Sequence, residues 1–259
     1  LTPRKQKSVN LPSKTFCILP WIHFFHSPSG AISPCCAAKS GTFGNLRDFA
    51  FVDEIVNTDA MKSVRAEMLQ GQEPVACASC YKEESLGLKS FRENKNEDIE
   101  GIDINALVDN TATDGTVSDF KMQYWDSRFS NICNLKCRMC GHMLSSAWET
   151  ELRTQDAKID YALPEYAWMQ PKIKQQIEQF TDQVVVKEFL TAVENKTIEE
   201  IYWVGGEPLM YDIHWKIMKY LVISGHSKNV VVRYNTNLSR DSYQGDELFE
   251  LLKYFKRVN

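Results

Sequence analysis

The chain has 259 residues and is 43% hydrophobic, enough to bury the core of one large or two small domains. Its formal net charge of −4 gives no overall basic surface of the kind that binds nucleic acid. No run reaches the roughly 18 apolar residues of a membrane span, and no apolar segment follows the basic residues Arg4, Lys5 and Lys7 as in a signal peptide. Composition therefore argues against nucleic acid and membrane as partners.

The 8 cysteines are clustered rather than spread along the chain. They form a vicinal pair, a C-x2-C motif and a C-x3-C-x2-C motif, with one further cysteine near the N-terminus. Such clusters favour metal binding in a reducing compartment over disulfides, so we expect a cytoplasmic protein.

Residues 1–92 are predicted to form a small cysteine-rich domain. A turn at 29–30 leads into a short strand that ends on cysteine, and a helix is expected over 53–70, where Gly71 stops it. Four thiolates are available from Cys17, one of Cys35 and Cys36, Cys77 and Cys80. Taken alone, four thiolates fit zinc and an iron–sulfur cluster equally well. Within the vicinal pair we favour Cys35, which follows a proline, and expect Cys36 to be a small buried side chain.

Residues 93–118 are rich in Asp, Asn, Glu and Gly and contain few apolar side chains. This composition predicts a solvated acidic linker between two domains, with the second domain covering 119–259.

A strand predicted at 120–125 runs into Cys133, Cys137 and Cys140. A zinc site usually takes four donors in tetrahedral geometry, whereas three thiolates on one short loop suit three corners of a 4Fe–4S cube. The fourth iron then has no protein ligand and is open to the amine and carboxylate of a small molecule. In a β/α barrel, functional groups follow the carboxyl ends of the strands, as this loop does.

The rest of the chain alternates between strands and helices. After a polar and aromatic insertion at 156–170 and helical periodicity over 173–193, a strand at 201–204 enters Gly205-Gly206-Glu207-Pro208. A helix over 213–222 precedes a strand at 230–234, which ends in Asn235-Thr236-Asn237, and a helix over 248–255 follows. This alternation predicts an α/β fold with parallel strands, and the final residues lead towards a further strand that is not expected to form.

The C-x3-C-x2-C loop followed by Gly-Gly-Glu-Pro resembles the radical S-adenosylmethionine (radical SAM) superfamily. The resemblance implies that Cys133, Cys137 and Cys140 bind the catalytic 4Fe–4S cluster, and that Gly205, Gly206, Glu207 and Pro208 receive the methionyl amine of S-adenosylmethionine. It also implies cofactor contacts for Asn237 and Met139, although Leu238 and Met139 stand where the superfamily favours a glycine and an aromatic residue. We count about three of the six β/α units of the superfamily's partial barrel, so the chain is expected to be a C-terminally truncated fragment.

The order of parts over about residues 16–82 resembles the auxiliary-cluster modules called twitch or SPASM domains, placed here before the barrel. This resemblance implies that Cys17, Cys35 or Cys36, Cys77 and Cys80 hold an auxiliary iron–sulfur cluster, with zinc as the alternative.

Together the two resemblances imply an oxidoreductase or transferase that reductively cleaves S-adenosylmethionine. The 5′-deoxyadenosyl radical would abstract hydrogen from an unidentified substrate, with a peptide or protein side chain favoured, and a flavodoxin or ferredoxin would supply electrons. The alternative is a zinc or iron–sulfur module with a degenerate half barrel that binds a partner without catalysis.

Overall fold

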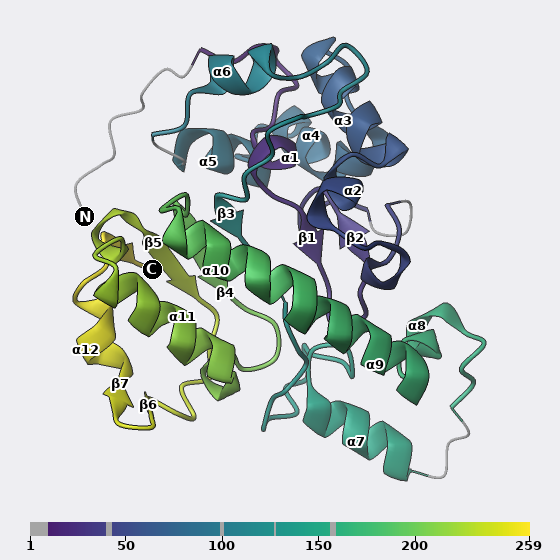
Figure 1. Cartoon of the computed structure of the whole chain (residues 1–259). Coiled ribbons are helices and arrows are strands. Elements are labelled where there is room, and N and C mark those ends of the chain that lie inside the picture. Colours follow the sequence, from purple (N-terminus) through teal and green to yellow (C-terminus); the bar gives the residue numbers. More distant parts are fainter. Residues whose placement is uncertain (1–9, 40–42, 99–100, 127, 156–158) are drawn as a thin grey trace.

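The computed structural model describes residues 10–39, 43–98, 101–126, 128–155 and 159–259. The basic residues at 4–7 and the start of the predicted insertion, 156–158, lie outside this description. Short helices dominate the first part of the chain, and a parallel sheet with its helices dominates the second (Figure 1). No described helix is both long and apolar enough to cross a membrane.

The N-terminal part contains one small hairpin surrounded by short helices. The hairpin pairs β1 (Phe25–His26) with β2 (Ile32–Ser33) in antiparallel register. The helical segments of this part are α1 (Leu19–Ile22), η1 (Leu46–Asp48), α2 (Val52–Val56), α3 (Asp59–Leu69), η2 (Val75–Cys77), α4 (Ala78–Ser85), α5 (Phe91–Asp98) and α6 (Ile104–Asp109).

The single helix predicted over 53–70 is divided in two. Thr58 adopts a non-helical conformation between α2 and α3, and its hydroxyl caps α3 by accepting a hydrogen bond from the Met61 amide. Inside α3, the fully buried Arg65 donates to the carbonyl oxygens of Gly115, Pro20 and Val56 at 2.6, 3.0 and 2.6 Å. The Arg65 guanidinium thus ties α3 to three other segments.

The C-terminal part is built on a four-stranded parallel sheet with the order β3 (Tyr124–Trp125), β4 (Glu200–Trp203), β5 (Val231–Tyr234) and β8 (Arg257–Val258). Trp125 lies opposite Ile201, which lies opposite Val232. The predicted α/β class and parallel sheet are confirmed. The expectation that no further strand forms is wrong, because residues 257–258 pair with β5. The number of barrel units stays a prediction.

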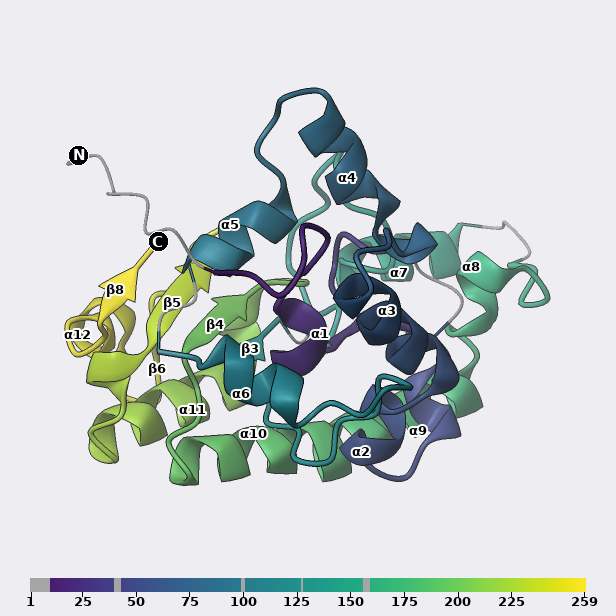
Figure 2. The ribbon, with the colours of Figure 1, turned by 90° about the horizontal axis from the view of Figure 1, so that it is seen from above.

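Helices cover one face of this sheet (Figure 2). The Trp125 ring stacks on the Phe189 ring of α10, with ring centroids 4.1 Å apart. The Trp203 ring contacts the His214 ring of α11 edge to face, with ring centroids 4.8 Å apart. The elements that connect the strands are α7 (Ser146–Thr154), α8 (Pro164–Ala167), α9 (Pro171–Phe180), η3 (Thr181–Val185), α10 (Val186–Glu194), η4 (Pro208–Met210), α11 (Asp212–Ile223), η5 (Ser227–Asn229), β6 (Ser242–Tyr243), β7 (Asp246–Glu247) and α12 (Leu248–Leu252).

The opposite face of the sheet is polar and is covered in part by α5. Lys95 of α5 donates to Glu200 at 2.6 Å, and its ammonium lies 3.8 Å from the centre of the Tyr124 ring. Arg233 donates to Glu200 and to Asp98, each at 2.7 Å. We refer to this surface, between α5 and the strands, as the polar face of the sheet.

The stretch 93–118, predicted to be a solvated linker, is in part helical and packed, although its residues 101–114 are not buried. Most of α5 and all of α6 lie in this stretch, and Lys95, Asn96 and Val117 are buried. Asn96 accepts from the Ile18 amide and donates to the Phe16 carbonyl oxygen, at 2.9 and 2.8 Å. Lys95 and Asp98 form ion pairs with Glu200 and Arg233, which are distant in sequence, and composition does not reveal such pairs.

Candidate radical SAM and iron–sulfur sites

The cysteine loop follows β3 and has no regular secondary structure. Cys133 and Cys140 are half-buried and Cys137 is exposed. The Cys140 amide donates to the Cys137 carbonyl oxygen at 3.0 Å. Burial, together with the neighbouring Cys137 and Cys133 thiols, raises the pKa of the Cys140 thiol. The structure thus brings all three predicted cluster ligands together.

The N-terminus of α7 holds this loop in place. The Cys133 amide donates to the Ser146 hydroxyl at 3.1 Å, and Ser145, the N-cap of α7, donates to the Leu135 carbonyl oxygen at 2.7 Å. The Trp148 indole donates to the Cys137 carbonyl oxygen at 3.1 Å. These bonds fix the backbone and leave the three thiols free to bind a metal.

The Gly-Gly-Glu-Pro turn lies directly against the cysteine loop. Gly205 and Gly206 have φ values of +85° and +58°, a region that glycine adopts most readily. A Cβ on Gly206 would overlap the Tyr211 hydroxyl and the Ile132 carbonyl oxygen. The Glu207 amide donates to that same carbonyl oxygen at 2.7 Å. The two loops approach this closely because residue 206 has no side chain.

The Glu207 carboxylate is 1% exposed and is held by three donors. It accepts from the Leu209 amide at 3.0 Å, the Thr236 hydroxyl at 2.6 Å and the Asn237 amide at 2.6 Å. Three donors on two carboxylate oxygens hold the side chain in one orientation. Glu207 is therefore a fixed acceptor beside the cysteine loop.

Asn237 connects the third loop to the first. Its side-chain amide lies 3.1 Å from the Asn134 side-chain oxygen and 3.9 Å from the Cys133 sulfur. The next residue, Leu238, has a φ of +52°, so it adopts the conformation that a glycine would favour. The loops after β3, β4 and β5 thus form one hydrogen-bonded cluster.

Met139 is 99% exposed. The described residues therefore place no group against it, and its predicted contact with the adenine stays a prediction.

Four of the N-terminal cysteines line one small cavity of about 20 Å³, which Met68, Phe91 and Arg92 also border; they are Cys17, Cys35, Cys77 and Cys80. Burial, and then the other thiols around the cavity, raise the pKa of Cys77 to about 12 and that of Cys35 well above its ordinary value. Thiols in such a place keep their protons unless a metal displaces them. This donor set fits a thiolate-bound cluster.

Cys36 does not line this cavity. Its thiol faces Asp126, and burial followed by that carboxylate raises the pKa of Cys36 to about 12. Of the five N-terminal cysteines predicted as metal ligands, the structure thus brings four together and directs the fifth towards the sheet.

No three cysteine, histidine or carboxylate groups converge on a single-ion site within the described ranges. The ligands of a 4Fe–4S cube each bind a different iron, so their sulfurs need not meet around one point.

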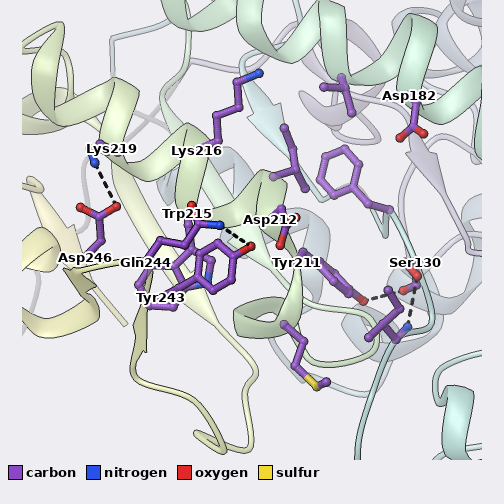
Figure 3. A pocket seen from close by; sticks show the side chains of 15 residues that line it. Ser130, Asp182, Tyr211, Asp212, Trp215, Lys216, Lys219, Tyr243, Gln244 and Asp246 are labelled. Atoms are coloured by element: carbon purple, nitrogen blue, oxygen red, sulfur yellow. Dashed lines mark hydrogen bonds and ion pairs between the residues drawn. The ribbon is translucent and has the colours of Figure 1, made fainter.

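A groove of about 690 Å³ lies behind the cysteine loop, on the helical side of the sheet (Figure 3). Its wall includes Ser130, Trp215 and Tyr211, whose hydroxyl donates to the Ser130 carbonyl oxygen at 2.6 Å. Its lining residues include neither Glu207 nor any of the cysteines. The groove thus adjoins the cysteine loop through Ile132 but includes none of the predicted cluster ligands.

Sequence reasoning missed the charged residues of the polar face, Lys95, Asp98, Glu200 and Arg233. The only signal was Arg233 within the predicted strand 230–234, where a fully buried parallel strand is usually apolar; Glu200 lies just before the predicted strand 201–204.

Comparison with protein families agrees with this geometry. A model described as an iron–sulfur cluster-binding domain (SPASM) matches residues 17–81. No curated protein and no solved structure matches the chain significantly. A model described as the radical SAM superfamily matches residues 127–259, which is more than half of the chain. The chain belongs to the radical SAM superfamily, with the SPASM domain preceding the radical SAM domain.

Proposed function

We propose that the chain is a radical SAM enzyme whose catalytic 4Fe–4S cluster is held by Cys133, Cys137 and Cys140. The observation that carries the proposal is the hydrogen-bonded contact among the three loops after β3, β4 and β5, which places Glu207 and Asn237 beside the cysteines. When bound, such a cluster would supply the one electron that splits S-adenosylmethionine into methionine and a 5′-deoxyadenosyl radical, and the radical would abstract hydrogen from a substrate.

In this scheme the chain's own residues bind and orient S-adenosylmethionine. Glu207 accepts a hydrogen bond from the methionyl ammonium, since a carboxylate prefers a cationic donor. Gly205 and Gly206 let the backbone approach the ligand closely, and Pro208 begins the short helix η4 behind them. The protein contributes position and exclusion of water, while the cofactor contributes the reactivity.

We assign an auxiliary iron–sulfur cluster to Cys17, Cys35, Cys77 and Cys80, with zinc as the alternative. The shared cavity supports this ligand set, and the orientation of Cys36 towards Asp126 argues against Cys36 as a ligand. The proposed substrate is a peptide or protein side chain, and the electron donor is a flavodoxin or ferredoxin.

The test is metal analysis after anaerobic purification. About eight irons per chain are expected, falling to about four in the triple alanine variant of Cys133, Cys137 and Cys140. The matched pair Cys35→Ala and Cys36→Ala then separates the vicinal cysteines. Only Cys35→Ala should lower the iron and sulfide of the N-terminal site, and an equal loss in both variants would contradict the assignment.

Catalysis is tested by 5′-deoxyadenosine formation under reducing conditions, which Cys133→Ala should abolish. Product formation that persists in Cys133→Ala would refute the catalytic site. A chain that retains zinc, binds no iron and forms no 5′-deoxyadenosine would instead be the non-catalytic binding module.

A further inference from the structure

The Cys133 sulfur differs from the other two predicted cluster ligands because it accepts hydrogen bonds. It lies 3.5 Å from the Leu135 amide nitrogen of the same loop, and 3.9 Å from the side-chain nitrogen of Asn237 on the loop after β5. Among the described residues, no group donates a hydrogen bond to the Cys137 or the Cys140 sulfur. The three thiolates of the proposed cluster are therefore unequal.

Other hydrogen bonds fix the orientation of the Asn237 side chain. Its oxygen accepts from the Ser239 amide at 2.9 Å, so its nitrogen is the atom that faces the cysteine loop. That nitrogen carries two N–H groups, of which one donates to the Asn134 side-chain oxygen at 3.1 Å and the second can donate to the Cys133 sulfur. The Asn237 backbone amide donates to the buried Glu207 carboxylate at 2.6 Å. The donor is thus held in place by neighbours other than the sulfur.

A donor to a thiolate ligand stabilises the reduced form of an iron–sulfur cluster more than the oxidised form. One-electron reduction adds one negative charge, which the irons share with the sulfurs around them. Hydrogen bonds to the sulfurs are for this reason among the factors that set the reduction potential of a cluster. A contact of 3.9 Å is long for a hydrogen bond, so its effect on the potential should be modest.

We propose that Asn237 is a positioning residue that raises the reduction potential of the catalytic cluster through its N–H···S contact with Cys133. This inference rests on the proposed function, because it requires a cluster bound at the three cysteines of the loop. In the proposed reaction an electron from the protein donor enters the cluster before S-adenosylmethionine is cleaved, and a higher potential favours that first transfer. The Leu135 donor is a backbone amide that most residue types would provide, whereas the Asn237 donor depends on the side chain.

The test is a redox titration of the reconstituted chain with dithionite as the source of electrons, followed by EPR in the absence of S-adenosylmethionine. The signal to follow is the one that the triple alanine variant of Cys133, Cys137 and Cys140 lacks, which separates it from the auxiliary cluster. In Asn237→Ala, the equilibrium constant for one-electron reduction should fall by about three- to tenfold, a shift of about 30–60 mV to more negative potential. An unchanged potential would overturn the proposal.

Ser239→Ala is the matched control, because Ser239 connects the same two loops without a contact to the sulfur. Its hydroxyl donates to the Asn134 side-chain oxygen at 3.2 Å, the same atom that accepts from Asn237. Ser239→Ala should therefore leave the potential at the wild-type value. An equal shift in both variants would show that Asn237 acts only by holding the loops together, and this would overturn the proposal.

A second measurement applies even if Asn237→Ala cannot hold its cluster. Asn134→Asp keeps an acceptor oxygen for Asn237 but removes the neighbouring amide nitrogen. Pulsed EPR of this reduced variant, with 15N in the side-chain amides of its asparagines, should show a nitrogen coupled to the cluster. The absence of such a coupling would overturn the proposal.

These outcomes are distinct from failure of the proposed function. A chain that binds no iron at the three cysteines would contradict the catalytic site itself. A complete cluster whose potential is the same in Asn237→Ala and in the wild type would contradict only the inference about Asn237.

Discussion

Gly206→Ala tests whether the close contact of the cysteine loop with the Gly-Gly-Glu-Pro turn depends on the missing side chain. Gly206 has a φ of +58°, and a Cβ there would overlap the Tyr211 hydroxyl and the Ile132 carbonyl oxygen and lie 3.0 Å from the carbonyl carbon of Asn131. The alanine can be accommodated only if the two loops separate. Separation would lengthen the 2.7 Å bond from the Glu207 amide to Ile132.

The magnitude follows from two contributions. A left-handed conformation costs a residue other than glycine about 1–2 kcal/mol. Forcing an additional methyl group into a packed site costs about 1–3 kcal/mol. We therefore expect Gly206→Ala to destabilise the chain by about 2–5 kcal/mol. Gly225 provides the matched control, since its φ is +70° and a Cβ would meet nothing within 4 Å. Gly225→Ala should cost only the first contribution, about 1–2 kcal/mol.

The assay is urea unfolding of both variants and the wild type, with S-adenosylmethionine binding to the reconstituted chain measured by equilibrium dialysis. Gly206→Ala should be the less stable variant and should bind the cofactor more weakly, whereas Gly225→Ala should bind it like the wild type. Equal stability and equal binding in the two variants would show that the loops tolerate a side chain and refute the reasoning.

Three further predictions concern the scaffold. Lys196 has a φ of +57° just after α10, where its amide and the Thr197 amide donate to carbonyl oxygens of the last helical turn. Because glycine adopts this conformation most readily, Lys196→Gly should stabilise the chain by about 0.5–1 kcal/mol in urea unfolding. A loss of stability would contradict this. Arg65→Met should destabilise by about 3–5 kcal/mol in the same assay, because it leaves buried carbonyl oxygens without donors, and a cost below about 1 kcal/mol would refute that role. Burial lowers the pKa of His214 from 6.5 to about 3, so the unfolded state takes up its proton first and stability is lost as the pH falls through this window. His214→Gln should make that pH dependence shallower by up to one proton, and an unchanged slope would show that His214 does not contribute.

Much of the arrangement around the cysteine loop could be predicted from sequence because parallel strands determine where their loops meet. The sequence predicts successive parallel strands at 120–125, 201–204 and 230–234. The residues that follow these strands must then lie at the same edge of the sheet. The SPASM and radical SAM motifs add residue types that are specific to this chemistry. The contact of Asn237 with Cys133 follows from these two constraints.

The polar face could not be predicted, because its interactions join residues far apart in sequence. Lys95 and Glu200 form a buried ion pair although they are 105 residues apart, and in the sequence each looks like an ordinary surface charge. The short strand β8 was missed for a related reason. Residues 257–258 have no strand pattern of their own, and their extended conformation is stabilised by pairing with β5.

The vicinal pair Cys35 and Cys36 connects the N-terminal cysteine cavity to the parallel sheet. Cys35 lines the auxiliary cavity, while the next side chain faces Asp126 on the polar face of the sheet. One peptide bond therefore separates a proposed ligand of the auxiliary cluster from a side chain that packs against the sheet. A shift of the Cys35 backbone on loss of that cluster would move Cys36 as well. Loss of the auxiliary cluster should for this reason disturb the contact of Cys36 with Asp126, although Cys36 does not line the cavity.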